Sequence, residues 1–327
     1  MRIIKTIFWN SAQSRIRTGF RILLVLAVYM FFYKGYLFLL THAGILLYYS
    51  SQSSLWTFLI AGSVRLLPSL IALWIVGRFI DRRKVRGFGF HFNKNWWIDF
   101  CFGLGLGGLL ISLIFMVEVS LGWISISDIF YSRSNQPPFI VPFLVFLYVF
   151  SCTSISEELF ARGYLIKNLA EGFKIKNMSA KASVIIAWCF TSIIFGLAHL
   201  GNPNATFIGT INLIIAGLTL GTGFILTGEL AIPIGLHIAW NFFQANVFGF
   251  PVSGLSYPAE IVTMIKIDQI GPEMWTGGVF GPEAGLLGLL AMLLGFFITL
   301  MWIRIRRGIK FREIHAPLAS TPDTIIH

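Results

Sequence analysis

Charged residues are scarce in this chain of 327 residues, since Asp, Glu, Lys and Arg together make up 12% of it and hydrophobic residues 56%. A soluble globular domain of this size needs a more polar surface, so that class is excluded. Cysteine is scarce too, and Cys101, Cys152 and Cys189 all fall in apolar stretches without a CxxC spacing. Neither a disulfide framework nor a zinc knuckle is indicated.

Long apolar runs take the place of a polar surface. A membrane-spanning helix needs about 20 predominantly apolar residues, and eight stretches of the chain qualify. Because helices satisfy their own backbone groups in lipid, the sequence predicts an all-α, polytopic transmembrane bundle with about eight spans. The predicted spans are approximately 20–41, 55–77, 97–122, 139–157, 182–199, 206–226, 231–250 and 281–303.

Acidic residues are fewer than basic ones, 14 against 25, which leaves a formal charge of +11. With eight spans, 20 of the 25 basic residues fall on one side of the membrane, among them Arg15, Arg21 and Arg83. This asymmetry follows the positive-inside rule and predicts that both termini are cytoplasmic. The basic residues are then expected to set the orientation of the spans and to contact anionic lipid headgroups. Nucleic acid is not an expected partner.

No internal repeat divides the chain. The simplest organisation has two peripheral spans and a basic cytoplasmic linker (1–95), a core bundle (96–303) and a basic cytoplasmic tail (304–327). The Pro- and Gly-containing segment 251–280 is expected to be a plain surface loop, with a lid as the alternative. Glycines 103, 105, 107 and 108 predict a small-residue face for close helix packing, because no strand precedes them as in a phosphate loop.

The first candidate site is Glu157-Glu158-x-x-x-Arg162. Glu158 and Arg162 are four residues apart, so they share one helix face and can form an ion pair. Glu157 points about 100° away. We therefore expect Arg162 to hold Glu158 in place, while Glu157 projects into a cavity as a general base. The alternative is a structural ion-pair cluster at the membrane boundary.

Two further motifs place a histidine within an apolar span: Phe195-x-x-x-His199 and His237-x-x-x-Asn241. Ionisable residues at that depth are costly and face the bundle interior, which marks a functional site by default. His237 and Asn241 share a helix face and offer donors for a developing oxyanion. Taken alone, His199 has the alternative of a hydrogen-bonded core histidine, and the alternative for His237 and Asn241 is interhelical hydrogen bonding.

Convergence of the three motifs is compatible with helix geometry. If the chain turns near residue 175, Glu157 and His199 differ in depth by roughly 9 Å at a rise of 1.5 Å per residue. A tilt, or a helix break near His199, must close that gap. His237 reaches the depth of Glu157 from a turn near Gly228. The spacing thus permits one site, with access expected from the cytoplasmic side.

In this order and on these spans, the motifs resemble those of the CAAX-processing prenyl protease and bacteriocin-immunity family of intramembrane peptidases. The resemblance rests on residues 156–163, 195–199 and 235–241, and residues 277–283 are similar to a stretch in bacterial members. It covers approximately 138–303. The function that it implies is an intramembrane endopeptidase that hydrolyses a peptide bond by means of a glutamate-activated water.

The resemblance implies three roles for six residues: a water-activating Glu157 assisted by His199, oxyanion stabilisers His237 and Asn241, and an organising pair, Glu158 and Arg162. Eukaryotic members cleave a C-terminal tripeptide from a prenylated cysteine. This chain looks bacterial, so that substrate is not carried over. The expected partners are membrane lipid and a membrane-associated peptide or protein substrate, and the expected location is a bacterial inner (plasma) membrane.

Glu157, His199 and His237 could also form a three-ligand zinc site with an open position. No HExxH motif is present, and catalysis without a cofactor is favoured. The GxSG signature of serine intramembrane proteases and an aspartate pair within the spans are absent as well. One rival interpretation is a non-catalytic immunity or peptide-binding protein. A proton-coupled transporter is the weaker rival, because no inverted repeat is visible.

Overall fold

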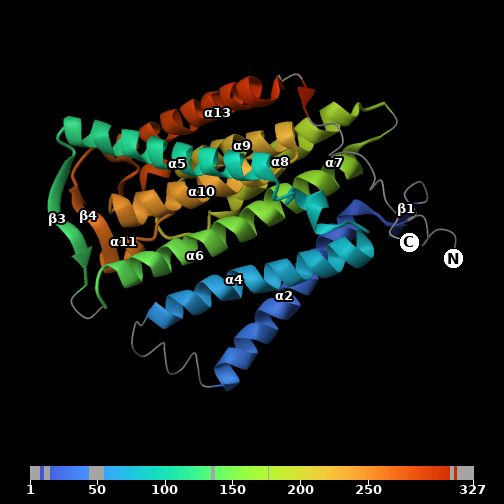
Figure 1. Ribbon diagram of the computed structural model, residues 1–327, viewed down its shortest axis with the longest axis horizontal. Helices are drawn as coiled ribbons and strands as arrows, with labels where there is room; N and C mark the ends of the chain where they lie inside the picture. Colours follow the sequence, from blue (N-terminus) through green and yellow to red (C-terminus); the bar gives the residue numbers. More distant parts are fainter. Residues whose placement is uncertain are drawn as a thin grey trace.

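Helices dominate the computed structural model, which describes residues 8–10, 15–43, 55–133, 137–175, 177–309 and 313–314 (Figure 1). Seven helices in these ranges are long and apolar enough to cross a membrane. The predicted all-α polytopic bundle is confirmed, and the protein is a multi-pass membrane protein. The seven are α2 (Thr18–His42), α4 with η1 (Leu55–Ile80), α5 (Lys94–Ser120), α6 with η3 and α7 (Ile140–Phe173), α8 (Ala180–Ala198), α9 (Phe207–Thr227) and α13 (Leu286–Arg307).

The eighth predicted span, 231–250, is a shorter helix at the centre of the bundle. It comprises α10 (Ala231–Phe242) and the π-helical η4 (Phe243–Val247), and all of α10 is buried. The helix packs against α5, α6 and α9. Because protein surrounds it, its length does not have to match the thickness of the lipid. It still carries the chain along the bundle, so the start of α2 and the end of α13 lie at the same end (Figure 1).

Close contact between α5 and α10 depends on glycine in both helices. A Cβ on Gly103 would lie 2.5 Å from the Ile232 carbonyl oxygen, and a Cβ on Gly235 would lie 2.3 Å from the Phe100 carbonyl oxygen. Any side chain at either position would force the two helices apart. The predicted small-residue packing face is confirmed for Gly103 and Gly107, which place the histidine-bearing helix α10 directly against α5, whereas Gly105 faces open space.

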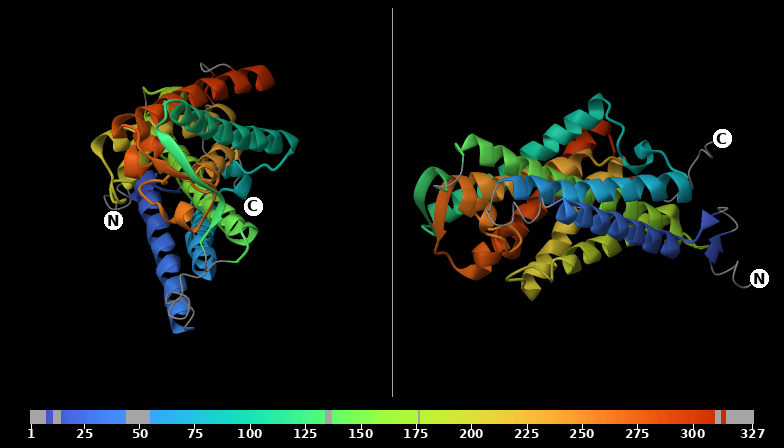
Figure 2. Two further views of the ribbon diagram at one scale, coloured as in Figure 1. Left: turned by 90° about the vertical axis from the view of Figure 1, so that its left-hand side faces the viewer. Right: turned by 90° about the horizontal axis from the view of Figure 1, so that it is seen from below.

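Two antiparallel strands cover the end of the bundle opposite the start of α2 (Figures 1 and 2). Strand β3 (Ile124–Ser132) pairs with β4 (Val262–Gln269), which lies in the segment expected to be a plain loop. That segment also contains the short helices α11 (Tyr257–Ile261) and α12 (Glu273–Thr276). The expectation of a plain surface loop is therefore wrong, because segments about 140 residues apart supply each other's backbone hydrogen bonds.

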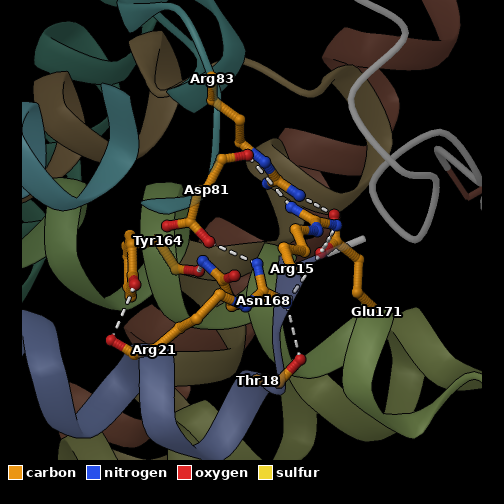
Figure 3. A network of polar contacts seen from close by, with 8 residues as sticks. All are labelled: Arg15, Thr18, Arg21, Asp81, Arg83, Tyr164, Asn168 and Glu171. Atoms are coloured by element: carbon orange, nitrogen blue, oxygen red, sulfur yellow. Dashed lines mark hydrogen bonds and ion pairs between the residues drawn. The ribbon is translucent and has the colours of Figure 1, made fainter. Parts of the chain in front are cut away.

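A buried charge cluster joins the N-terminal helices to the core (Figure 3). Glu171 of α7 (Lys167–Phe173) pairs with Arg15, Arg21 and Arg83, and Arg21 also pairs with Asp81. All five side chains are at least nine-tenths buried. Burial lowers the pKa of Arg83 to about 9 and that of Arg15 to about 10, so both remain cations at neutral pH. These three arginines bind carboxylates inside the protein, contrary to the expectation that they contact lipid headgroups.

The remaining elements are short. They are β1 (Trp9–Asn10), β2 (Arg15–Ile16), η2 (Val85–Phe88), η5 (Gly278–Phe280) and η6 (Pro282–Ala284).

Candidate active site

The three motifs converge on one cavity of about 490 Å³ between α6 and α8, closed on its inner side by α10. Glu157, His199, His237 and Asn241 all line it. Glu158 and Arg162 do not, because both side chains are buried behind the cavity wall. The structure thus brings together all six predicted site residues, four on the wall and two supporting it.

Glu158 binds both Arg162 and His237, and it forms with Arg162 a supporting layer behind the cavity wall. Its Oε1 accepts a hydrogen bond from Arg162 Nη1 at 2.7 Å and lies 2.8 Å from His237 Nδ1. The predicted i,i+4 ion pair is confirmed. The bond to His237 joins residues 79 positions apart, and no local pattern indicates it. A carboxylate that faces a guanidinium only accepts, so the proton on this edge of the imidazole belongs to His237 Nδ1.

Glu157 has the opposite environment. Its side chain is 33% exposed, whereas that of Glu158 is fully buried. The ionisable groups next to it are His237 Nε2 at 3.9 Å and Arg65 Nη1 at 4.0 Å. Both separations exceed hydrogen-bond length, and no hydrogen bond to this carboxylate occurs among the described residues. The two adjacent glutamates therefore face differently, as predicted, and Glu157 is available to the cavity.

His199 caps the C-terminal end of α8, where the helix ends as expected. Its Nδ1 lies 2.7 Å from the carbonyl oxygen of Phe195, which only accepts, so Nδ1 carries the proton. In the neutral ring, Nε2 is then a free acceptor. The end of α8 places this ring on the wall of the same cavity as Glu157.

Phe195 is a site-organising residue that the choice of polar candidates missed. Its ring lies 4.6 Å from the Arg162 guanidinium carbon, 4.8 Å from the His199 ring and 6.2 Å from the His237 ring. The side chain packs on the supporting layer and on both histidines at once. The sequence does offer one indication of this role, because Phe195 lies one helical turn before His199.

π-helical turns lie within the first motif and just after the third. η3 (Leu159–Ile166) begins directly after Glu158, and η4 begins two residues after Asn241. Such widened turns cost helix stability and occur frequently at functional sites. Because η3 contains Arg162 and η4 lies just beyond Asn241, the helix phase changes within or next to these motifs, which a uniform 3.6-residue period cannot predict.

The cavity also reaches a second buried carboxylate, Glu283, at the end of the bundle that carries β3 and β4. Glu283 accepts hydrogen bonds from the backbone N–H and hydroxyl of Ser253 and from the amide of Gln244. Burial raises its pKa above the ordinary value, against the effect of these donors. From Glu157 the cavity extends to Ser253, Tyr257 and Glu283. Access from the cytoplasmic side stays a prediction.

A metal-ligand cluster is not formed by the part of the chain that the structure describes. No group of three His, Cys, Asp or Glu side chains there is arranged to hold a metal ion, and this includes the alternative set Glu157, His199 and His237. The residues present do not fit the zinc site as they stand.

The fold and the site together define the class of protein. It is a multi-pass membrane protein with a cluster of polar side chains around a cavity inside the helical bundle. The family follows from comparison with known proteins. Residues 139–243 match the family described as Type II CAAX prenyl endopeptidase Rce1-like, and this region contains all six predicted site residues. No curated protein and no solved structure matches the chain. The resemblance of the motifs to the CAAX protease-like family is confirmed for residues 139–243.

Proposed function

We propose that this protein is an intramembrane endopeptidase of glutamate type, which hydrolyses a peptide bond of a membrane-associated peptide or protein. The observation that carries the proposal is the contrast between the two glutamates. Glu158 is locked by Arg162 and His237, whereas Glu157 faces the cavity without a hydrogen bond from any described residue. A general base needs this availability, because it must accept a proton from water.

In the proposed reaction, Glu157 takes a proton from water as the water oxygen attacks the carbonyl carbon of the scissile bond. The protonated Glu157 then donates that proton to the leaving amine nitrogen as the C–N bond breaks. His199 offers Nε2 as an acceptor, because its Nδ1–H is committed to the Phe195 carbonyl. It can thereby orient the attacking water toward the substrate.

His237 and Asn241 are the proposed oxyanion stabilisers. The Asn241 amide donates without any change of protonation state. His237 donates its Nδ1 proton to Glu158, so its Nε2 carries a second proton only when the ring is an imidazolium. The buried Glu158 carboxylate counters that positive charge. Arg162 fixes Glu158, donates to the carbonyl of Gly217 and packs on Phe195, which orients the whole supporting layer.

The substrate class follows from the location and lining of the cavity. It lies within the bundle, and apolar side chains such as Phe150, Leu220 and Trp240 make up most of its wall. An extended apolar peptide segment delivered from the membrane suits such a site. We place the protein in a bacterial inner membrane with both termini in the cytoplasm, in accordance with the distribution of its basic residues.

The deciding experiment compares wild type with Glu157→Gln in detergent, against a library of membrane peptides, with and without a chelator. Glu157→Gln keeps the shape of the side chain and removes the base. Glu273→Gln, at an exposed glutamate away from the cavity, is the matched control. We expect wild type and the control to cleave in chelator, and Glu157→Gln to be slower by at least about 10²–10⁴-fold.

Other outcomes assign other functions. Cleavage that stops in chelator and returns with zinc would replace the glutamate mechanism by a metal mechanism. Equal rates for wild type and Glu157→Gln would remove Glu157 as the base. Peptide binding without cleavage, by protein shown to be folded, would favour a non-catalytic immunity or peptide-binding role.

A further inference from the structure

Arg65 is a cation on the wall of the catalytic cavity that none of the sequence motifs includes. It lies in the middle of α4, outside the region that matches the family, and it lines the same cavity as Glu157. A charged residue at that depth in a spanning helix is costly and is retained where it has a partner or a function.

The contacts of Arg65 leave most of its hydrogen-bonding capacity unused. Its side chain is 55% exposed, and its ion pair with Glu157 has an N–O separation of 4.0 Å. A guanidinium has five donors in a planar fork, which suits a carboxylate held at hydrogen-bond distance. Where this protein locks a carboxylate, as in Glu158 with Arg162, the separation is 2.7 Å. The pair of Arg65 with Glu157 is too loose to be a lock of that kind.

Two tyrosines complete a polar patch around Arg65. Tyr29 of α2 and Tyr257 of α11 line the cavity, and both interact electrostatically with Arg65. Tyr257 is anchored by stacking on Phe58, which lies two turns before Arg65 on α4. Three different elements thus bring a guanidinium and two phenol groups to one part of the wall, and all three groups can donate to an anion.

We propose that Arg65, with Tyr29 and Tyr257, forms a subsite that binds a carboxylate of the substrate close to the scissile bond. This inference rests on the proposed peptidase function and specifies its substrate class: a membrane peptide with an acidic group near the cleavage site. A substrate carboxylate at this position accepts charge-assisted hydrogen bonds from Arg65, which Glu157 is too distant to accept. A cationic group in its place would be repelled by Arg65.

The carboxylate could belong to an acidic side chain or to a free C-terminus. Matched peptides separate these sources: one pair carries Glu or Gln beside the cleavage site, and another carries a C-terminal acid or amide. Binding is measured first, in the Glu157→Gln background, so that the result does not depend on turnover. Arg65→Gln is then added to that background, with Lys34→Gln as the control, since Lys34 is an exposed cation of α2 that does not line the cavity.

We expect the acidic member of one peptide pair to bind about tenfold or more tightly than its neutral partner, as charge-assisted hydrogen bonds warrant. Arg65→Gln should abolish this preference, Lys34→Gln should preserve it, and Arg65→Lys should retain part of it. In the active protein, the preference should appear as a change in KM for acidic peptides, with little change for neutral ones.

Two results would overturn the inference. One is equal binding of acidic and neutral peptides by the unsubstituted cavity. The other is a preference that survives Arg65→Gln. If Arg65→Gln lowers kcat equally for every peptide and leaves binding unchanged, Arg65 acts only on Glu157. Failure of the proposed function is recognised separately, because it appears as absence of cleavage in wild type while the binding preference persists.

Discussion

His237 Nδ1 lies 2.8 Å from Glu158 Oε1, and the same oxygen accepts a hydrogen bond from Arg162. One buried carboxylate oxygen therefore organises two of the three motifs. The other edge of the imidazole faces Glu157, with Nε2 3.9 Å from Oε2. The two adjacent glutamates stand on either side of one histidine, the first open to the cavity and the second holding the ring. In the proposed mechanism the two glutamates therefore have different roles and are not interchangeable.

Replacement of Glu158 should damage stability as well as activity. Glu158→Ala leaves Arg162 buried without its carboxylate, and breaking a buried pair in this way costs about 3–5 kcal/mol. The double variant Glu158→Ala/Arg162→Met should lose less, because it also removes the stranded charge. The free energy of unfolding, from denaturant titration in detergent, measures both. Equal stability of wild type and Glu158→Ala would remove the structural role of the pair.

Asn241→Ala should slow turnover with little effect on folding. Loss of one oxyanion donor lowers kcat by about 10²–10³-fold, or about 2.7–4 kcal/mol in the barrier. The contrast is Asn246→Ala, at a buried amide that donates to the backbone carbonyls of Pro258 and Val262 and does not line the cavity. Asn246→Ala should lower the melting temperature more than Asn241→Ala does. An unchanged kcat in Asn241→Ala would show that Asn241 is not an oxyanion donor.

The charge cluster in Figure 3 should be essential for holding the N-terminal helices to the core. Glu171→Gln leaves Arg15, Arg21 and Arg83 without their shared carboxylate in a buried site, with an expected loss of about 3–5 kcal/mol. Arg86→Gln changes an exposed cation of the same linker region and should stay within about 0.5 kcal/mol of wild type. Similar melting temperatures for the two variants would contradict the proposed role.

Glu283 should make stability depend on pH. Its pKa is raised in the folded protein, mainly by burial, so the folded state holds the proton more tightly than the unfolded state does. Stability from this group is therefore greatest below the unfolded pKa and falls as the pH rises through the folded pKa. Glu283→Gln should flatten this fall over the pH range that starts at the ordinary carboxyl pKa and extends upward. Unfolding curves across that range, with Glu273→Gln as control, test the prediction; parallel curves for wild type and Glu283→Gln would refute it.

Local pattern was sufficient for the helical architecture and for the parts of the site that lie within one helix. Apolar runs of about 20 residues predict spanning helices, because lipid offers no hydrogen bonds to the backbone. The four-residue spacing of Glu158 and Arg162 predicts their ion pair for the same kind of local reason. The glycines of α5 predicted its close packing, although not that α10 would be the partner.

Contacts between distant segments were decided only by the tertiary structure. The bond from His237 to Glu158, the pairing of β3 with β4 and the burial of Arg15, Arg21 and Arg83 join residues from different elements. No spacing along the chain encodes them. In the sequence, Arg65 is an isolated charge within a predicted span, and Glu283 lies at the start of a predicted helix. The fold places both residues on the wall of the cavity that Glu157 also lines. The sequence by itself determined the helices and the local pairs, because these depend on neighbours one turn apart. The tertiary structure determined the cavity, because its wall depends on which helices pack together.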